Sequence, residues 1–234
     1  MNLPVPLQGI DTNLWLMDYE LKMLGINLHR VVTIIRLASG KLIIHSTAPF
    51  SMTEVDEIRE LGTPEWLVDV LLRHDTFAAE GRAAFPDASY LAPEGFSRNL
   101  PFPTGSLLSP PAEWAEEVEV AAIEGVPAFG EIVMFHRPSR TLIVGDLIVN
   151  FSDVQGWWAK LFSKAASVGR NYQPGVTKPF KGAIQDRGAI ASSIRKILEW
   201  DFDRVIVGHG GFLASGGKEK LRAALKNAEV MQEL

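Results

Sequence analysis

The sequence contains no cysteine, and this absence excludes disulfide bonds, thiolate metal sites and a cysteine nucleophile. Any metal ion bound by this chain must therefore be held by histidine, aspartate or glutamate. The sequence contains only five histidines, so the position of each can be considered separately.

A strong excess of charge of either sign is also lacking. The chain carries 23 basic and 28 acidic residues, a net charge of −5, and the basic residues are scattered. Nucleic-acid-binding proteins usually concentrate positive charge on one surface, so no nucleic-acid partner is expected. No apolar run approaches the ~20 residues that span a bilayer, and the N-terminus does not resemble a secretory signal. We therefore expect a soluble, cytoplasmic protein with no membrane partner.

What is present is the composition of a folded protein. The chain has 234 residues, of which 47% are hydrophobic and 22% charged, enough to bury a substantial core. Apolar residues alternate or run continuously in some segments and recur at helical spacing in others. The expected strands cover residues 13–17, 31–37, 42–45, 66–72, 89–91, 118–123, 134–135, 142–144 and 204–207, and the expected helices 52–61, 76–85, 153–168, 187–200 and 218–231.

The order of these segments predicts the fold class. Each half of the chain begins with antiparallel strands and then passes into helix and strand, with polar residues at the strand ends. Two sheets, each covered by helices on one face, satisfy this order better than a regular alternation of strands and helices. We expect an α/β protein that forms a four-layer αββα sandwich, as one domain over 1–234 with pseudo-equivalent halves of about 1–117 and 118–234.

Polar residues follow four of the predicted strands. His45 ends one strand, His74 and Asp75 follow the next, Asp146 follows a hairpin strand after a glycine, and His209 follows the last strand. If these strand ends share one edge, the fold gathers three imidazoles and one or two carboxylates. Zinc, iron and manganese sites use such ligands when cysteine is absent. The same set could instead perform acid–base catalysis without a metal.

Several motifs occur in an order that resembles a known family. His74 lies in a strand-end turn, SRTLIVGDL covers 139–147, QDRGAI covers 185–190, and WDFDRVIVGHG covers 200–210. This order resembles the metallo-β-lactamase superfamily, and in particular a branch known only as a domain of unknown function. The resemblance implies two mixed β-sheets flanked by helices in an αββα sandwich, and a metal-dependent hydrolase ancestry.

The motif that binds metal in that superfamily is mostly lost here. Its pattern H-x-H-x-D-H places the first histidine at His74, but the other three ligands fall on Thr76, Ala78 and Ala79. A further histidine of the family falls near Val126, which cannot bind a metal. The resemblance therefore implies a degenerate metal site, and no standard dinuclear centre is expected.

The remaining residues define the predicted site. Asp146 and His209 are the expected catalytic residues, and Asp146 occupies the position of the superfamily's bridging carboxylate. A single zinc or iron ion held by His45, His74, Asp146 and His209 is one hypothesis for the metal. The residues expected to bind a ligand are His45, His74, Asp75 and Arg187. A structural alternative is that Asp146 pairs with Arg187 and that His45 is an ordinary strand-end histidine.

Three functions follow from these interpretations. The first is a protein that lacks dinuclear hydrolase activity and binds a small polar or anionic ligand in the cleft that holds the metal centre in the superfamily. The second is a hydrolase with an atypical mononuclear site. The third is a structural protein that forms a homodimer through the predicted helix 153–168, in which the adjacent Trp157 and Trp158 cannot both face one core.

Overall fold

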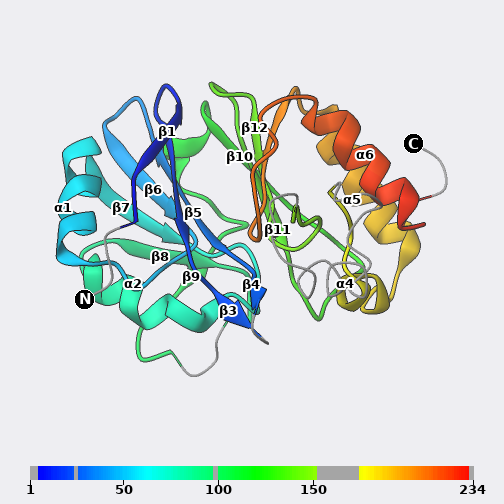
Figure 1. Ribbon diagram of the computed structural model, residues 1–234, viewed down its shortest axis with the longest axis horizontal. Helices are drawn as coiled ribbons and strands as arrows, with labels where there is room; N and C mark the ends of the chain where they lie inside the picture. Colours follow the sequence, from blue (N-terminus) through cyan, green and yellow to red (C-terminus); the bar gives the residue numbers. More distant parts are fainter. Residues whose placement is uncertain (1–4, 24–25, 97–99, 152–173, 232–234) are drawn as a thin grey trace.

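Two β-sheets pack face to face, and helices cover the outer face of each (Figure 1). The computed structural model describes residues 5–23, 26–96, 100–151 and 174–231. The four layers confirm the αββα sandwich that the sequence predicts.

The strands are β1 (Gln8–Asp11), β2 (Leu14–Tyr19), β3 (Lys22–Met23), β4 (Ile26–Asn27), β5 (Arg30–Arg36), β6 (Lys41–His45), β7 (Thr63–Val68), β8 (Ser89–Ala92), β9 (Gly105–Ser106), β10 (Val118–Ala122), β11 (Ile132–His136), β12 (Thr141–Ile143) and β13 (Arg204–Ile206). The helices are α1 (Met52–Leu61), α2 (Ala78–Ala84), α4 (Lys178–Gly182), α5 (Arg187–Glu199) and α6 (Gly217–Asn227), with two 3₁₀ turns, η1 (Asp75–Phe77) and η2 (Ala112–Trp114).

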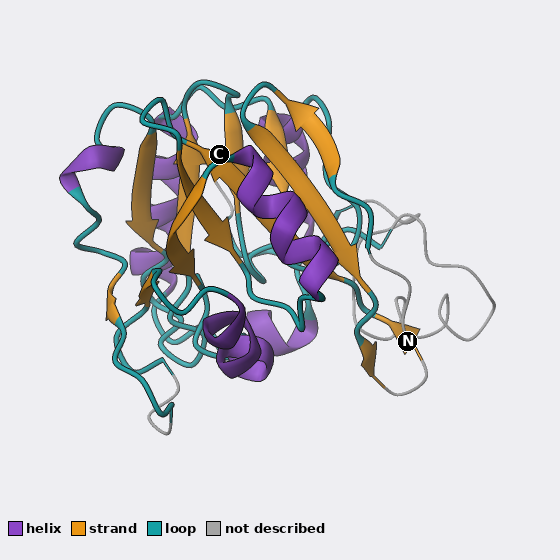
Figure 2. Ribbon diagram, turned by 90° about the vertical axis from the view of Figure 1, so that its left-hand side faces the viewer, coloured by secondary structure: helices purple, strands orange, loops and turns teal. Residues whose placement is uncertain are grey.

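The first sheet has seven strands in the order β1-β2-β5-β6-β7-β8-β9. Its first four strands are antiparallel neighbours, and β6, β7, β8 and β9 are parallel to one another. Helix α1 connects β6 to β7, and α2 lies between β7 and β8, so these two parallel pairs have the crossover helices that are usual for such pairs. Figure 2 views the molecule from the side of the sheet that carries these helices.

The second sheet has four strands in the order β10-β11-β12-β13. Strands β11 and β12 form the predicted hairpin, and β12 pairs in parallel with β13. The carboxyl ends of β12 and β13 therefore lie at the same edge of this sheet.

Alternation along the strands divides the core into three layers. In β5, Val31 and Ile35 pack between the two sheets, whereas Val32 and Ile34 pack beneath the helices of the first half. In the second sheet, Ile143 likewise faces inward, and its neighbours pack against α5 and α6. Because both faces of each sheet are covered, the central strands β5, β6, β11 and β12 are buried along nearly their whole length.

The helix boundaries follow local sequence signals. Ser51 caps α1 in a reciprocal capping box with Glu54, and Asp186 caps α5 by accepting from two backbone N–H groups. Strand β7 ends at Val68, before the predicted end at residue 72. Beyond Val68 the backbone bonds to the other sheet, since the amide of Ile132 donates to the carbonyl oxygen of Val70 at 2.8 Å.

Three further expectations concern the C-terminal half and the membrane. The terminal helix, α6, ends at Asn227, before the predicted end at residue 231. The predicted helix 153–168, with Trp157 and Trp158, lies outside the described residues. Among the described residues, no helix is long and apolar enough to cross a bilayer.

Candidate metal centre

Three of the predicted residues meet at the edge between the two sheets. His74 lies between β7 and η1, Asp146 follows β12, and His209 follows β13. Asp146 and His209, both from the second sheet, come together because β12 and β13 are parallel neighbours. The loop after β7 brings His74 to them, since its backbone crosses to the second sheet at Val70.

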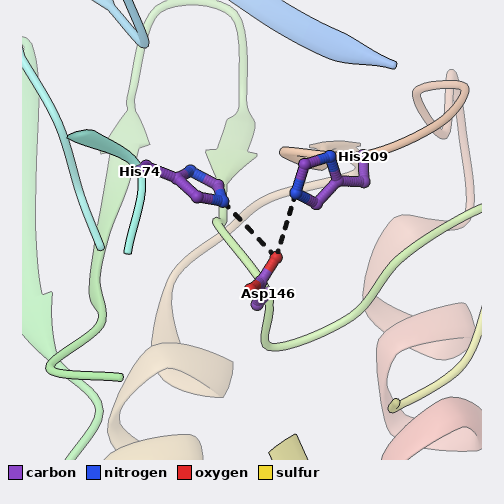
Figure 3. A group of neighbouring side chains, drawn as sticks. All are labelled: His74, Asp146 and His209. Carbon is purple, nitrogen blue, oxygen red and sulfur yellow. Dashed lines mark ion pairs between the residues drawn. The ribbon is translucent and has the colours of Figure 1, made fainter. Parts of the chain in front are cut away.

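The ligand atoms of these three side chains converge (Figure 3). Nε2 of His74 and Nε2 of His209 each lie 3.6 Å from Oδ1 of Asp146, and the three ligating atoms lie within 4.8 Å of one another. A distance of 3.6 Å is too long for a hydrogen bond. It is close to the roughly 3.4 Å that separates two ligands of one tetrahedral metal with bonds of about 2.1 Å.

Burial makes this arrangement costly without a further partner. Nε2 of His74 and Oδ1 of Asp146 are buried and have no hydrogen-bond partner among the described residues. A buried polar atom without a partner costs about 1–3 kcal/mol. The spacing, the burial and the donor types fit one metal ion.

A backbone contact fixes the orientation of the His209 ring. Its Nδ1 lies 2.7 Å from the carbonyl oxygen of His29, so the ring N–H donates there and the Nε2 lone pair faces Asp146. Metal-binding histidines commonly donate their second nitrogen to such an acceptor. His29 adopts a φ of 62°, an uncommon conformation for a residue other than glycine.

The electrostatics of the site favour the protonation states that bind metal. Burial lowers the pKa of His74 to about 4, so this imidazole is neutral at pH 7. Burial acts to raise the pKa of Asp146, but its contacts with His74 and the nearby charges of His209 and Arg30 outweigh that effect and lower the pKa. Neutral imidazole and ionised carboxylate are the forms that act as metal ligands.

A buried carboxylate lies directly behind Asp146. Glu131 is only 1% exposed, and its two oxygens accept from the amides of Gly145 at 2.8 Å and Asp146 at 3.1 Å. Burial, with a contribution from the nearby charge of Asp146, raises the pKa of Glu131 to about 8.

A buried ion pair holds the backbone of His74. Arg30 donates from Nη2 to Oδ1 of Asp69 at 3.1 Å and to the carbonyl oxygen of His74 at 2.9 Å. Its Nε donates to the carbonyl oxygen of Thr47 at 3.0 Å, and Tyr90 donates its hydroxyl proton to Asp69. Arg30 and Asp69 are almost completely buried, so this network fixes the first-sheet side of the site.

A close backbone approach requires glycine next to His209. A Cβ atom on Gly208 would lie 3.0 Å from Cε1 of His74 and 3.0 Å from the carbonyl oxygen of Gly145. The GHGG sequence thus lets β13 approach both of the other ligand-bearing loops.

The other predicted site residues lie elsewhere. His45 is 1% exposed and lies within β6, between Thr33 and Val68 on the neighbouring strands. Its ring nitrogens have no hydrogen-bond partner among the described residues, and it is not part of the three-residue group. The hypothesis of a four-ligand site is therefore corrected: His45 is fixed inside the sheet, whereas the three ligands lie on loops beyond the strand ends.

Asp75 and Arg187 are also separate from the group. Asp75 is exposed at the start of η1. Arg187 is exposed in α5, and its Nη1 donates to the carbonyl oxygen of Glu229 at 2.8 Å. The alternative in which Asp146 pairs with Arg187 is wrong, because the ion-pair partners of Asp146 within the described part of the chain are His74 and His209.

Glu131, Arg30 and Asp69 were not predicted from the sequence. Arg30 begins β5, Glu131 precedes β11 and Asp69 follows β7, and charged side chains at such boundaries usually face solvent. The available signal was weak: Asp69 interrupts the apolar run WLVDVLL.

A model of a known family matches more than half of the chain. The model of a family described as "Domain of unknown function (DUF4336)" matches residues 11–173, a range that contains His74 and Asp146 but not His209. A search of curated proteins found no match.

Solved structures of metallo-β-lactamases resemble the chain over nearly its whole length. The DIM-1 metallo-β-lactamase is 14% identical, with a TM-score of 0.66 over 97% of this chain and 99% of that one. A metallo-β-lactamase from Hirschia baltica is 14% identical, with a TM-score of 0.65 over 97% and 98%. FIM-1 from Pseudomonas aeruginosa, in a mono-zinc form, is 15% identical, with a TM-score of 0.62 over 97% and 96%. At these identities the similarity shows a metallo-β-lactamase-like fold.

Proposed function

The chain belongs to the DUF4336 family, and from that premise we propose that it is a metal-dependent hydrolase with a mononuclear site formed by His74, Asp146 and His209. The observation that carries the proposal is the convergence of two Nε2 atoms on one carboxylate oxygen at 3.6 Å, with no hydrogen bond between them. One zinc or iron ion fits this ligand set.

The number of protein ligands supports a catalytic centre over a structural one. Structural zinc sites usually have four protein ligands, whereas catalytic sites have three and keep a position open for water or substrate. Two histidines and one carboxylate also form the ligand set of mononuclear iron enzymes, so zinc and iron are both candidates. When bound, such an ion supplies Lewis acidity and lowers the pKa of water. The mono-zinc form of FIM-1 is consistent with one ion in this fold.

The residues of the chain have distinct roles in this proposal. His74 and His209 present their Nε2 atoms, and the carbonyl oxygen of His29 holds the His209 ring in the required orientation. Asp146 presents Oδ1 between them (Figure 3), and a carboxylate oxygen at a metal site can also accept a proton from water or substrate.

A second function uses the same site. In that case the ion anchors a small polar or anionic ligand without turnover. The absence of metal-binding side chains at Thr76, Ala78 and Ala79 favours this reading, because a second ion that could assist hydrolysis would lack its ligands.

Metal content and turnover separate the two functions. Protein purified without a histidine tag is expected to contain about one zinc or iron per chain by mass spectrometry, and both H74A and H209A should lose it. D75A is the matched control, because Asp75 is an exposed acid next to His74 and outside the group. Metal content near zero in the wild type, after incubation with either ion, would refute the site.

Activity is then measured on the metal-loaded protein with a panel of β-lactam, lactone, thioester and phosphodiester substrates. Hydrolysis that disappears in D146N supports the hydrolase. The binding protein is supported if the chain holds one metal ion without turnover. In that case small anions should also change the visible absorption of the cobalt-substituted protein.

A further inference from the structure

Two buried carboxylates in this chain hold backbone amides in the same way. Glu131 accepts from the amides of Gly145 and Asp146 at 2.8 and 3.1 Å. Glu54 accepts from the amides of Val5 and Ser51, each at 2.6 Å. Glu131 and Glu54 are 1% and 2% exposed. Only Glu131 holds a residue of the metal site.

The backbone around Asp146 is held from two sides. On one side, strand β13 binds it: the amide of Val144 donates to Ile206 at 2.9 Å, and the amide of Gly208 donates to the carbonyl oxygen of Gly145 at 3.1 Å. On the other side, Glu131 accepts the next two amides of the turn. The position of the Asp146 main chain therefore depends on Glu131.

A carboxyl group suits this role better than a side-chain amide. Two adjacent amides point in one direction and need two acceptor atoms; both oxygens of a carboxyl group carry lone pairs, whereas a glutamine has one oxygen and one NH₂ group. A glutamine at this position would turn its NH₂ group toward one of the two amides.

We propose that Glu131 is a positioning residue of the metal centre: by binding the amides of Gly145 and Asp146, it places Oδ1 of Asp146 within reach of both histidines. This inference rests on the proposed metal site. Glu131 acts on Asp146 through the backbone amides of the turn rather than through the Asp146 side chain.

The test compares E131Q with E54Q in the full-length protein. Both variants remove a buried acceptor of two amides, so both should lower the melting temperature. E131Q should also weaken zinc binding by about 10- to 100-fold, the range observed when groups that orient metal ligands are removed. E54Q should retain the wild-type zinc affinity, because Glu54 lies at the start of α1, on the outer face of the first sheet.

The cobalt-substituted protein provides a readout that stability alone does not change. In E131Q the visible absorption bands of cobalt should shift in position and intensity, whereas E54Q should give the wild-type spectrum. Wild-type affinity and spectrum in folded E131Q would overturn the inference while leaving the metal site intact. Absence of zinc binding in the wild type would instead refute the proposed function itself.

A second variant separates reach from the chemistry of the carboxyl group. E131D keeps the carboxyl group but is shorter by one methylene, so it cannot reach both amides. Weak metal binding in E131D supports positioning, and wild-type binding overturns it.

If neither variant folds, hydrogen exchange in the metal-free wild type decides the question. The amides of Gly145 and Asp146 should be protected as well as those of β12. Fast exchange of both amides would overturn the inference.

Discussion

Nδ1 of His209 lies 2.7 Å from the backbone carbonyl oxygen of His29, a residue 180 positions earlier in the chain. The acceptor is a main-chain atom, so the orientation of the metal-binding ring depends on the backbone conformation at His29. That conformation has a φ of 62°. A strained residue of this kind persists only where its surroundings fix it, and such residues are common at functional sites.

Two substitutions of His29 should therefore have opposite outcomes. H29G keeps the carbonyl oxygen and adopts a positive φ without strain, so zinc affinity should remain within about threefold of wild type. H29V places a β-branched residue in this conformation and should destabilise the protein by about 1–3 kcal/mol and weaken zinc binding. Calorimetric titration with zinc and thermal unfolding measure both effects. Equal loss of metal in the two variants would show that the His29 side chain, rather than its backbone, supports the site.

Replacing His45 tests whether it belongs to the metal site. In the structure its ring is buried, without a hydrogen-bond partner among the described residues, and separate from the three-residue group. H45L should therefore bind one metal ion as the wild type does. Its free energy of unfolding should be unchanged or higher by about 1 kcal/mol, because an unpaired polar group is replaced by an apolar one. Loss of metal in a folded H45L protein would restore His45 as a ligand.

The buried pair of Arg30 and Asp69 gives a prediction about stability. D69N leaves the Arg30 charge buried without its counter-ion and should cost about 3–5 kcal/mol. Y90F removes one hydrogen bond to the same carboxylate and should cost only about 1 kcal/mol, because Thr47 still contacts that oxygen. Chemical denaturation of both variants provides the measurement. Costs of similar size would mean that the pair contributes little beyond its hydrogen bonds.

The pH dependence of stability follows from the buried titratable groups. Burial lowers the pKa of His45 to about 3 and those of His74 and His136 to about 4. The unfolded chain therefore takes up protons first as pH falls below 6.5, so these histidines lower stability between about pH 6.5 and 4. Glu131 has the opposite effect: its pKa is raised to about 8, so its contribution to stability is lost as pH rises from about 4.5 to 8.

These opposing effects place the maximum stability of the metal-free protein near pH 6.5. Burial also raises the pKa of Asp69 to about 6, so below that pH two acids oppose three histidines and leave a net loss as pH falls. Unfolding of EDTA-treated protein between pH 4.5 and 8.5 measures the profile. E131Q should remove the decline above pH 6.5. A wild-type stability that keeps rising from pH 6.5 to 8 would contradict this assignment of the buried acids.

The sequence predicted the layers of the fold well because its apolar periodicity is strong. Helix α5 ends within one residue of its predicted end, and α1 covers the predicted residues 52–61. The resemblance to the superfamily correctly predicted the fold. The pattern of polar residues after apolar strands correctly predicted that His74, Asp146 and His209 lie together.

The rest of the site depends on contacts that a linear pattern does not contain. His45 looked equivalent to His74 because both follow apolar segments, but the strand pairing of β6 continues through His45. Glu131 and Arg30 resemble surface charges in the sequence, and only the packing of two sheets shows that both are buried. Partners such as the His29 carbonyl group cannot be predicted from residue type at all.

The contact between His29 and His209 also determines when the site can form. The chain must place β13 beside β12 before His209 meets the other ligands, so the site forms only once these strands are paired. If the folding transition state lacks that pairing, metal leaves the refolding rate unchanged and slows only unfolding. During synthesis, a nascent chain that ends before β13 would already carry His74 and Asp146 but could not retain the ion. Metal uptake would then mark a nascent chain that extends past His209.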